Sequence, residues 1–205
     1  MTRSAFMSGT PDLAALGTMI AASQGWPAAK AVKAYCPTDA DKATVANLAR
    51  DLLDIYPDTI GACAPMSAAF AAGLERVLSA PIQVVAGSLF ADGTRVFGGD
   101  APFDGAASFA EGDLDWDGHV WVMIGAYVAD ISLFRTAYSR FAHPVLGRHV
   151  AATFGHGKGM YFDAWRHTTR LGLRYAPRHV LTRAQVDGLL GHAHATIKGH
   201  RQASG

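Results

Sequence analysis

The sequence predicts an α+β fold in which N-terminal helices and a central cysteine-bearing helix pack on an antiparallel sheet. Three observations support it: helical periodicity dominates the first quarter, short apolar runs joined by Gly turns follow, and a capped helical pattern closes the chain. The chain has 205 residues, 50% hydrophobic and 17% charged, so it is long enough for a single domain with its own core. We divide it into a helical lobe (1–56), a core segment (57–135) and a C-terminal extension (136–205).

Two helices are predicted in the lobe. Pro11 and Asp12 open the first, which reaches Ser23, and the Gly-Trp-Pro segment 25–27 ends it. The second runs over 39–55, because its preceding residue is a threonine, a good N-cap, and acidic residues in the first turn suit the positive end of the helix dipole.

The core segment begins with a helix and continues with strands. The helix runs over about 64–79, with Pro65 in its first turn, where no intrahelical donor is needed, and Pro81 stops it. Apolar runs joined in pairs by tight turns follow on both sides of a polar, acidic, Gly-rich loop. We place the strands at 82–90, 95–97, 120–124 and 127–133, and the loop at 98–118.

The C-terminal extension carries the weakest signals. Gly and His residues are scattered from Tyr138 to Gly159 without a clear period, so no element is predicted there. Thr182 caps a last helix over 183–197, and we expect the residues after it to form a polar tail.

The turn at Gly125-Ala126 predicts the register of the second hairpin. Glycine suits the first position of a type II′ turn, so residue 124 pairs with 127, and 121 lies opposite 130. Alternation then divides the hairpin into two faces. The apolar face belongs in the core and consists of Val120, Val122, Ile124, Tyr127, Ala129 and Ile131. The other face combines polar and apolar side chains: His119, Trp121, Val128, Asp130 and Ser132.

Cys63 lies at the start of the central helix. Unpaired backbone N–H groups and the positive end of the helix dipole favour a thiolate at such a position. Cysteine is also among the most buried residue types, so a structural role is the alternative for this residue taken alone.

His119 and Asp130 add a second chemical feature. On the predicted register they lie diagonally across the hairpin, roughly 7–8 Å apart between backbones and within reach of each other's side chains. A carboxylate there accepts the imidazole N–H, holds its tautomer and supports the imidazolium, as the acid of a nucleophile–base–acid triad does. A buried His–Asp pair that only stabilises the fold is the alternative.

Together these residues resemble the transglutaminase-like superfamily of papain-like cysteine enzymes. The similar segments, in order along the chain, are Gly61-Ala62-Cys63, Ala80-Pro81 with Val84-Val85-Ala86-Gly87, His119-Val120-Trp121, and Gly125-Ala126-Tyr127 with Asp130. The resemblance covers about residues 57–133. Val120 stands where the family usually has a small residue, Tyr127 where it often has tryptophan, and no proline follows Asp130. These departures leave the substrate open.

The resemblance implies a papain/transglutaminase-like core and a thiol enzyme that acts on an amide or peptide bond by hydrolysis or acyl transfer. Its implied catalytic residues are Cys63 as nucleophile, His119 as acid and base, and Asp130 as orienting carboxylate. Candidate substrate-binding residues are Trp121, Trp116 and Gly61, with core packing as an equal alternative for Trp121. The expected partner is a peptide, protein or small amide substrate, and the chemistry needs no metal or other cofactor. Two other readings stay open: a non-catalytic binding module with the same fold, and an acetyl-type acyltransferase with the same triad.

Composition argues against several other classes. Lys and Arg number 18 and Asp and Glu 17, for a net charge of +1, so no nucleic-acid partner is predicted. The longest apolar run, 120–134, is too short to span a bilayer, and no membrane association is predicted. Two cysteines are too few for a disulfide framework, so we expect reduced thiols and a cytoplasmic protein.

Three weaker motifs were weighed. Residues 113–118 match the start of a calcium loop, but Ile124 occupies the position of the bidentate Glu. Solvated charge is the default for this acidic loop, with a weak cation site or attraction of a basic substrate group as alternatives. Segment 155–159 lacks the upstream Gly and the Ser/Thr of a phosphate loop. His192 and His194 point in different directions on a helix, so no metal site is predicted.

Overall fold

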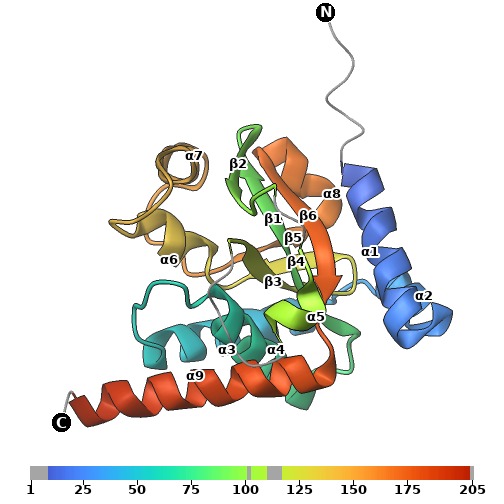
Figure 1. Cartoon of the computed structure of the whole chain (residues 1–205), viewed down its shortest axis with the longest axis horizontal. Helices are drawn as coiled ribbons and strands as arrows, with labels where there is room; N and C mark the ends of the chain where they lie inside the picture. Colours follow the sequence, from blue (N-terminus) through green and yellow to red (C-terminus); the bar gives the residue numbers. More distant parts are fainter. Residues whose placement is uncertain (1–8, 101–102, 110–116, 204–205) are drawn as a thin grey trace, which may run out of the picture.

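The structure is a computed structural model that describes residues 9–100, 103–109 and 117–203. Helices pack on both faces of an antiparallel sheet (Figure 1), which confirms the predicted α+β class. The longer helices are α1 (Gly9–Gln24), α2 (Trp26–Ala34), α3 (Asp39–Ile55), α4 (Cys63–Val77), α7 (Pro144–Phe154) and α9 (Arg183–Ala203). The short ones are α5 (Gly105–Ser108), α6 (Leu133–Tyr138), α8 (Trp165–Thr168) and the 3-10 turn η1 (Thr169–Leu171). Within the described ranges, no helix combines the length and apolar composition that a membrane span requires.

The strands of the described residues form one sheet around a long central strand. They are β1 (Ile82–Ala91), β2 (Thr94–Phe97), β3 (His119–Ile124), β4 (Tyr127–Asp130), β5 (Tyr161–Ala164) and β6 (Leu173–Val180). The order is β2-β1-β3-β4-β5, and β6 also pairs with β1. Strands β3 and β2 follow one another along one edge of β1, and β6 pairs along the other edge. All of these pairs are antiparallel.

The register of the β3–β4 hairpin is the predicted one. Ile124 pairs with Tyr127 and Val122 with Ala129, and Gly125 has the positive φ, 57°, that the turn requires. The two faces are therefore also those predicted, and both are buried.

The two faces of the sheet belong to two separate clusters of buried side chains. The aliphatic core lies between the sheet and helices α3, α4 and α9, which sit together on one side (Figure 1). Its central members are Phe70, Leu74, Val120, Val122, Ile124 and Ile131. The aromatic core lies on the opposite face, which α1, α6, α7 and α8 cover, and its central members are Leu89, Trp121, Phe134, Tyr161, Trp165 and Tyr175.

In the N-terminal lobe both predicted helices are confirmed, and the structure adds a third. Helix α3 covers 39–55 as predicted, and Thr38 and Asp41 form a reciprocal capping box at its start. Helix α1 ends at Gln24, directly before segment 25–27, as predicted, but a further helix that was not predicted, α2, begins at Trp26. Gly25, with a φ of 87°, turns the chain, and Pro27 fits the first turn of the new helix.

The C-terminal extension departs most from expectation. The strand expected over 127–133 ends at Asp130 and gives way to α6, and the region without predicted elements contains α7 and β5. The expected polar tail is the last part of α9, which continues to Ala203.

Strand β6 was also not predicted. Its Pro177 argues against a strand, but the register with β1 shifts beside this residue, and a proline is tolerated at such a bulge. The two strands approach closely: a Cβ at Gly87 would lie 2.1 Å from the Ala176 carbonyl oxygen. Tertiary pairing with β1 therefore overrides the local signal.

Candidate active site

His119 and Asp130 lie at adjacent ends of the β3–β4 hairpin. His119 is the first residue of β3 and Asp130 the last of β4. The imidazole Nε2 lies 2.6 Å from Asp130 Oδ2. The side chains are 1% and 0% exposed. The structure therefore brings together the two residues that the predicted register placed diagonally across the hairpin.

The carboxylate of Asp130 accepts further hydrogen bonds. Its Oδ1 receives the backbone N–H of Ser132 (3.1 Å), the Ser132 hydroxyl (3.1 Å) and the backbone N–H of Leu133 (2.9 Å). Its Oδ2 receives the Tyr175 hydroxyl from β6 at 3.0 Å. Because donors to a carboxylate favour its ionised form, this network compensates for burial of the charge.

Helix α4 brings Cys63 to the same end of the sheet. The helix packs on the apolar face of β3, where Ser67 donates its hydroxyl to the Val120 carbonyl at 3.0 Å. His119 points to the opposite face, but it is the first residue of its strand, so the first residue of α4 reaches it around the strand end. Cys63 is half-buried.

The electrostatics of His119 link all three groups. Burial lowers the pKa of His119, but the charge and hydrogen bond of Asp130, followed by the hydrogen bond and charge of Cys63, outweigh burial and raise it from 6.5 to about 10. Since Nε2 is bound to Asp130, Nδ1 is the ring nitrogen left for the sulfur. The arrangement is a Cys–His–Asp chain whose imidazole is held as the cation.

The start of α4 also leaves backbone donors free. The first bond into the helix runs from the Met66 N–H to the Ala62 carbonyl at 2.9 Å. Pro65 has no N–H, and the N–H groups of Cys63 and Ala64 precede the first intrahelical donor, the Met66 N–H. These donors and the positive end of the helix dipole can stabilise an oxygen that becomes negative beside the start of α4.

Aromatic rings enclose the imidazole. Phe97 ends β2 opposite Leu89, and His119 begins β3 opposite Gly87, so the two side chains meet on one face of β1. Their rings stack with centroids 5.3 Å apart. Trp121 and Tyr175 flank the imidazole at centroid distances of 6.4 and 6.5 Å. This packing restrains the ring and excludes water from the Nε2 side.

Tyr56, at the end of α3, is a buried neighbour of the cysteine. Burial and the charge of Cys63 raise the pKa of Tyr56, and a hydrogen bond with Thr196 of α9 and the charge of Arg135 oppose that rise. Arg135 of α6 donates to the backbone carbonyls of Leu53, Tyr56 and Pro57. This guanidinium ties α6, which follows Asp130, to the loop that leads to Cys63.

The predicted substrate-binding residues lie in different surroundings. Gly61 is exposed, two residues before Cys63, with a φ of 72° that favours glycine. Trp121 is fully buried, and its ring centroid lies 5.1 Å from that of Tyr175. These surroundings correspond to the alternative role of Trp121 in core packing. Trp116 lies outside the described residues.

Sequence reasoning missed Tyr175. The signal was present in the alternation of buried and less buried residues along β6, where Leu173, Tyr175 and Pro177 share one face. Pro177 obscured it.

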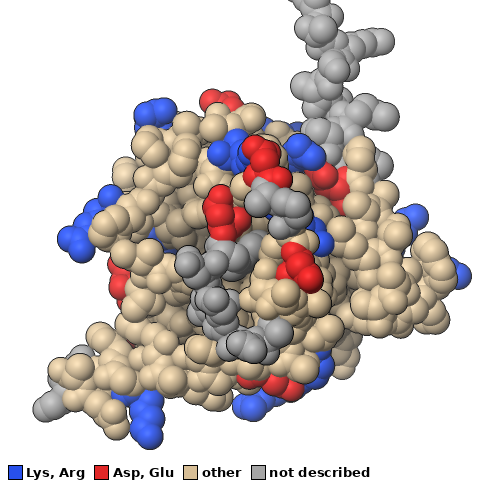
Figure 2. All heavy atoms as spheres, in the orientation of Figure 1, with Lys and Arg blue, Asp and Glu red and all other residues tan. Residues whose placement is uncertain are grey.

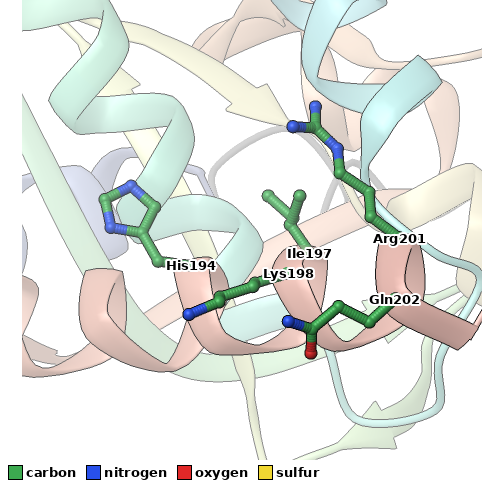
Figure 3. A pocket seen from close by; sticks show the side chains of 5 residues that line it. All are labelled: His194, Ile197, Lys198, Arg201 and Gln202. Carbon is green, nitrogen blue, oxygen red and sulfur yellow. The ribbon is translucent and has the colours of Figure 1, made fainter.

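No other part of the described chain offers comparable chemistry. Within it no group of His, Cys, Asp and Glu side chains is arranged to hold a metal ion. Most of the calcium-like segment, 113–116, lies outside the described residues. A hollow of about 460 Å³ lies along the exposed C-terminal part of α9 (Figure 3), and its lining contains no residue of the Cys–His–Asp chain. It is lined by His194, Ile197, Lys198, Arg201 and Gln202.

Comparison of this chain with family models, curated proteins and solved structures yields no match.

Proposed function

We propose that this protein is a thiol-dependent enzyme that breaks an amide or peptide bond through an acyl-enzyme on Cys63, as the resemblance to transglutaminase-like proteins implies. One observation carries the proposal: His119 Nε2 lies 2.6 Å from Asp130 Oδ2, and a hydrogen bond and the charge of Cys63 act on the same imidazole. These groups come from α4, β3 and β4, which are distant along the sequence.

The first half of the reaction forms a thioester. The Cys63 thiolate attacks the carbonyl carbon, and the oxygen that becomes negative accepts hydrogen bonds from N–H groups at the start of α4. When the C–N bond breaks, the His119 imidazolium transfers its proton from Nδ1 to the departing nitrogen. Asp130 keeps its negative charge throughout and holds Nε2–H.

The second half returns the enzyme to its starting state. Neutral His119 takes a proton from water or from a second amine, which attacks the thioester carbon. The C–S bond breaks and releases a carboxylic acid or a new amide, and Cys63 leaves as thiolate beside the re-formed imidazolium. Hydrolysis and acyl transfer differ only in which nucleophile enters.

The acetyl-type acyltransferase is the less favoured use of the same chain. A thioester donor built on a nucleotide needs a basic cleft for its phosphates. On the face seen in Figure 2, the described acidic and basic side chains are interspersed and form no large basic patch. This face therefore gives no support to a polyphosphate-bearing donor.

The decisive experiment compares the two cysteines of the same chain. Cys36 is exposed and Cys63 half-buried, so by access alone Cys36 should react faster. We expect the reverse below neutral pH, with iodoacetamide alkylating Cys63 faster, because the proposed mechanism requires a thiolate at this position. Cys36→Ser and Cys63→Ser variants assign the rates.

Equal rates at pH 6, or faster modification of Cys36, would contradict the proposal and leave the non-catalytic binding module. If Cys63 is the reactive residue, release of ammonia or amine from a panel of carboxamides and peptides identifies the substrate class. Mass spectrometry of the products with and without added amines then separates hydrolysis from transfer.

A further inference from the structure

Tyr175 contacts the candidate site from β6, which lies outside residues 57–133, the part of the chain that resembles transglutaminase-like proteins. It lies on β6, opposite Leu89 of β1, and its side chain extends over the same sheet face as His119. Gly87 of β1 pairs with both β3 and β6 and has no side chain between them. The Tyr175 hydroxyl donates to Asp130 Oδ2 at 3.0 Å, and the tyrosine is 1% exposed.

Among the donors to Asp130 the tyrosine has a distinct place. The two N–H groups and the serine hydroxyl that bind Oδ1 come from residues 132 and 133, directly after Asp130. Tyr175 alone shares Oδ2 with His119 Nε2. The phenol and the imidazolium therefore draw on the negative charge of the same oxygen.

We propose that Tyr175 is a positioning residue that holds Asp130 Oδ2 toward His119 and disperses its charge, and thereby limits how tightly the imidazolium keeps its proton. The proposal rests on the proposed function, which requires the imidazolium both to exist beside the thiolate and to give its proton to the leaving nitrogen. A carboxylate without the phenol donor would hold that proton more strongly.

The surrounding groups allow Tyr175 to act only as a donor. Burial and the charges of Asp130 and Tyr161 raise the pKa of its hydroxyl well above 10, so it stays protonated. The titratable groups that act on His119 are Asp130 and Cys63. Tyr161 of β5 is the other buried phenol, and its ring stacks on Tyr175 at a centroid distance of 6.3 Å.

Tyr161 provides a matched control, because its hydroxyl is buried without a hydrogen-bond partner. Tyr175→Phe and Tyr161→Phe remove the same atom from adjacent rings of one core, and only the first removes a bond to Asp130. Both are made in a Cys63→Ala background, and His119 is titrated by NMR, with His119→Gln to assign its signal. Circular dichroism checks that each variant is folded.

We expect Tyr175→Phe to move the His119 titration to higher pH and Tyr161→Phe to leave it in place. An unchanged or lower midpoint in Tyr175→Phe, or an equal shift in both variants, would overturn the proposal. With Cys63 restored, the rate of Cys63 alkylation is measured against pH. In Tyr175→Phe the plateau that reflects the thiolate–imidazolium pair should extend to higher pH than in wild type, and the rise at low pH should stay in place. Once a substrate is known, kcat should fall roughly tenfold with little change in KM, the size of one lost hydrogen bond to a charged group.

This design separates the two proposals. The NMR titration does not involve the thiol, so it tests Tyr175 even if wild-type Cys63 proves no more reactive than Cys36. In that case the proposed function fails, and the effect of Tyr175 on the His119 titration is still measured independently.

Discussion

The aliphatic core and the aromatic core cover opposite faces of the same sheet, and they differ in what they enclose. Phe70 and Leu74 of α4 and their neighbours fill the aliphatic core with apolar side chains. On the other face, a carboxylate and an imidazole are buried among aromatic rings. Helix α4 packs on the sheet through one face and carries Cys63 at its first residue, whereas His119 and Asp130 lie on the opposite face of the sheet.

Only the aromatic core carries the energetic cost of burying charged groups. A buried carboxylate is tolerated when donors surround it, and Asp130 has its donors from the β4–α6 turn, from β3 and from β6. Changes in the aliphatic core should therefore alter stability alone, whereas changes in the polar group of the aromatic core should alter stability and thiol reactivity together.

The largest effect is expected from Asp130→Asn. Without the carboxylate the imidazolium loses its counter-ion and no longer supports the thiolate that the proposed function requires, so alkylation of Cys63 at pH 6 should fall by about two orders of magnitude. We expect the protein to stay folded by circular dichroism but to lose most turnover, because Asn does not hold the imidazole tautomer. Near-wild-type alkylation would remove Asp130 from the site.

Phe70→Ala tests the opposite face. Phe70 is 0% exposed in α4, and its truncation should lower the free energy of unfolding by about 3–5 kcal/mol through lost burial and a cavity. Urea unfolding measures the loss. Under conditions where the variant is folded, its Cys63 alkylation profile should match wild type; a shifted profile would show that the two cores are not separable.

The pH dependence of stability gives a third test. The folded-state pKa of His119 is raised from 6.5 to about 10, so the folded state binds the proton more tightly than the unfolded state. This contribution is fully present below pH 6.5 and is lost as pH rises toward 10. Urea unfolding at intervals across that window should show falling stability, and the same series in Asp130→Asn should be flatter. Equal slopes would contradict the buried ion pair.

The smallest effect is expected from Thr38→Ala, which removes the capping box of α3 far from the imidazole. Loss of one N-cap should cost about 1 kcal/mol, or about 2–4 °C in Tm for a chain of this size. Thermal unfolding measures it, and Cys63 alkylation is the control. A change in reactivity would mean that α3, through Tyr56, influences the thiol.

Local patterns were sufficient for the site hairpin because the constraints there are short in range. A glycine in a two-residue turn determines the pairing of β3 with β4, and strict alternation then places His119 and Asp130 on one face. The same reasoning failed at β6, where Pro177 and weak alternation conceal a strand that forms only because β1 offers an unpaired edge. It was incomplete at α2, where the Gly and Pro that end α1 also start a new helix.

The α+β class, the capped helices and the faces of the hairpin could be predicted from the sequence, since each depends on neighbours a few residues apart. The packing of α4 on the apolar face, the approach of its first residue to His119 around the strand end, and the contact of Tyr175 with Asp130 could not. Such contacts depend on strand order and on the packing of segments that are distant in sequence. No local periodicity encodes them.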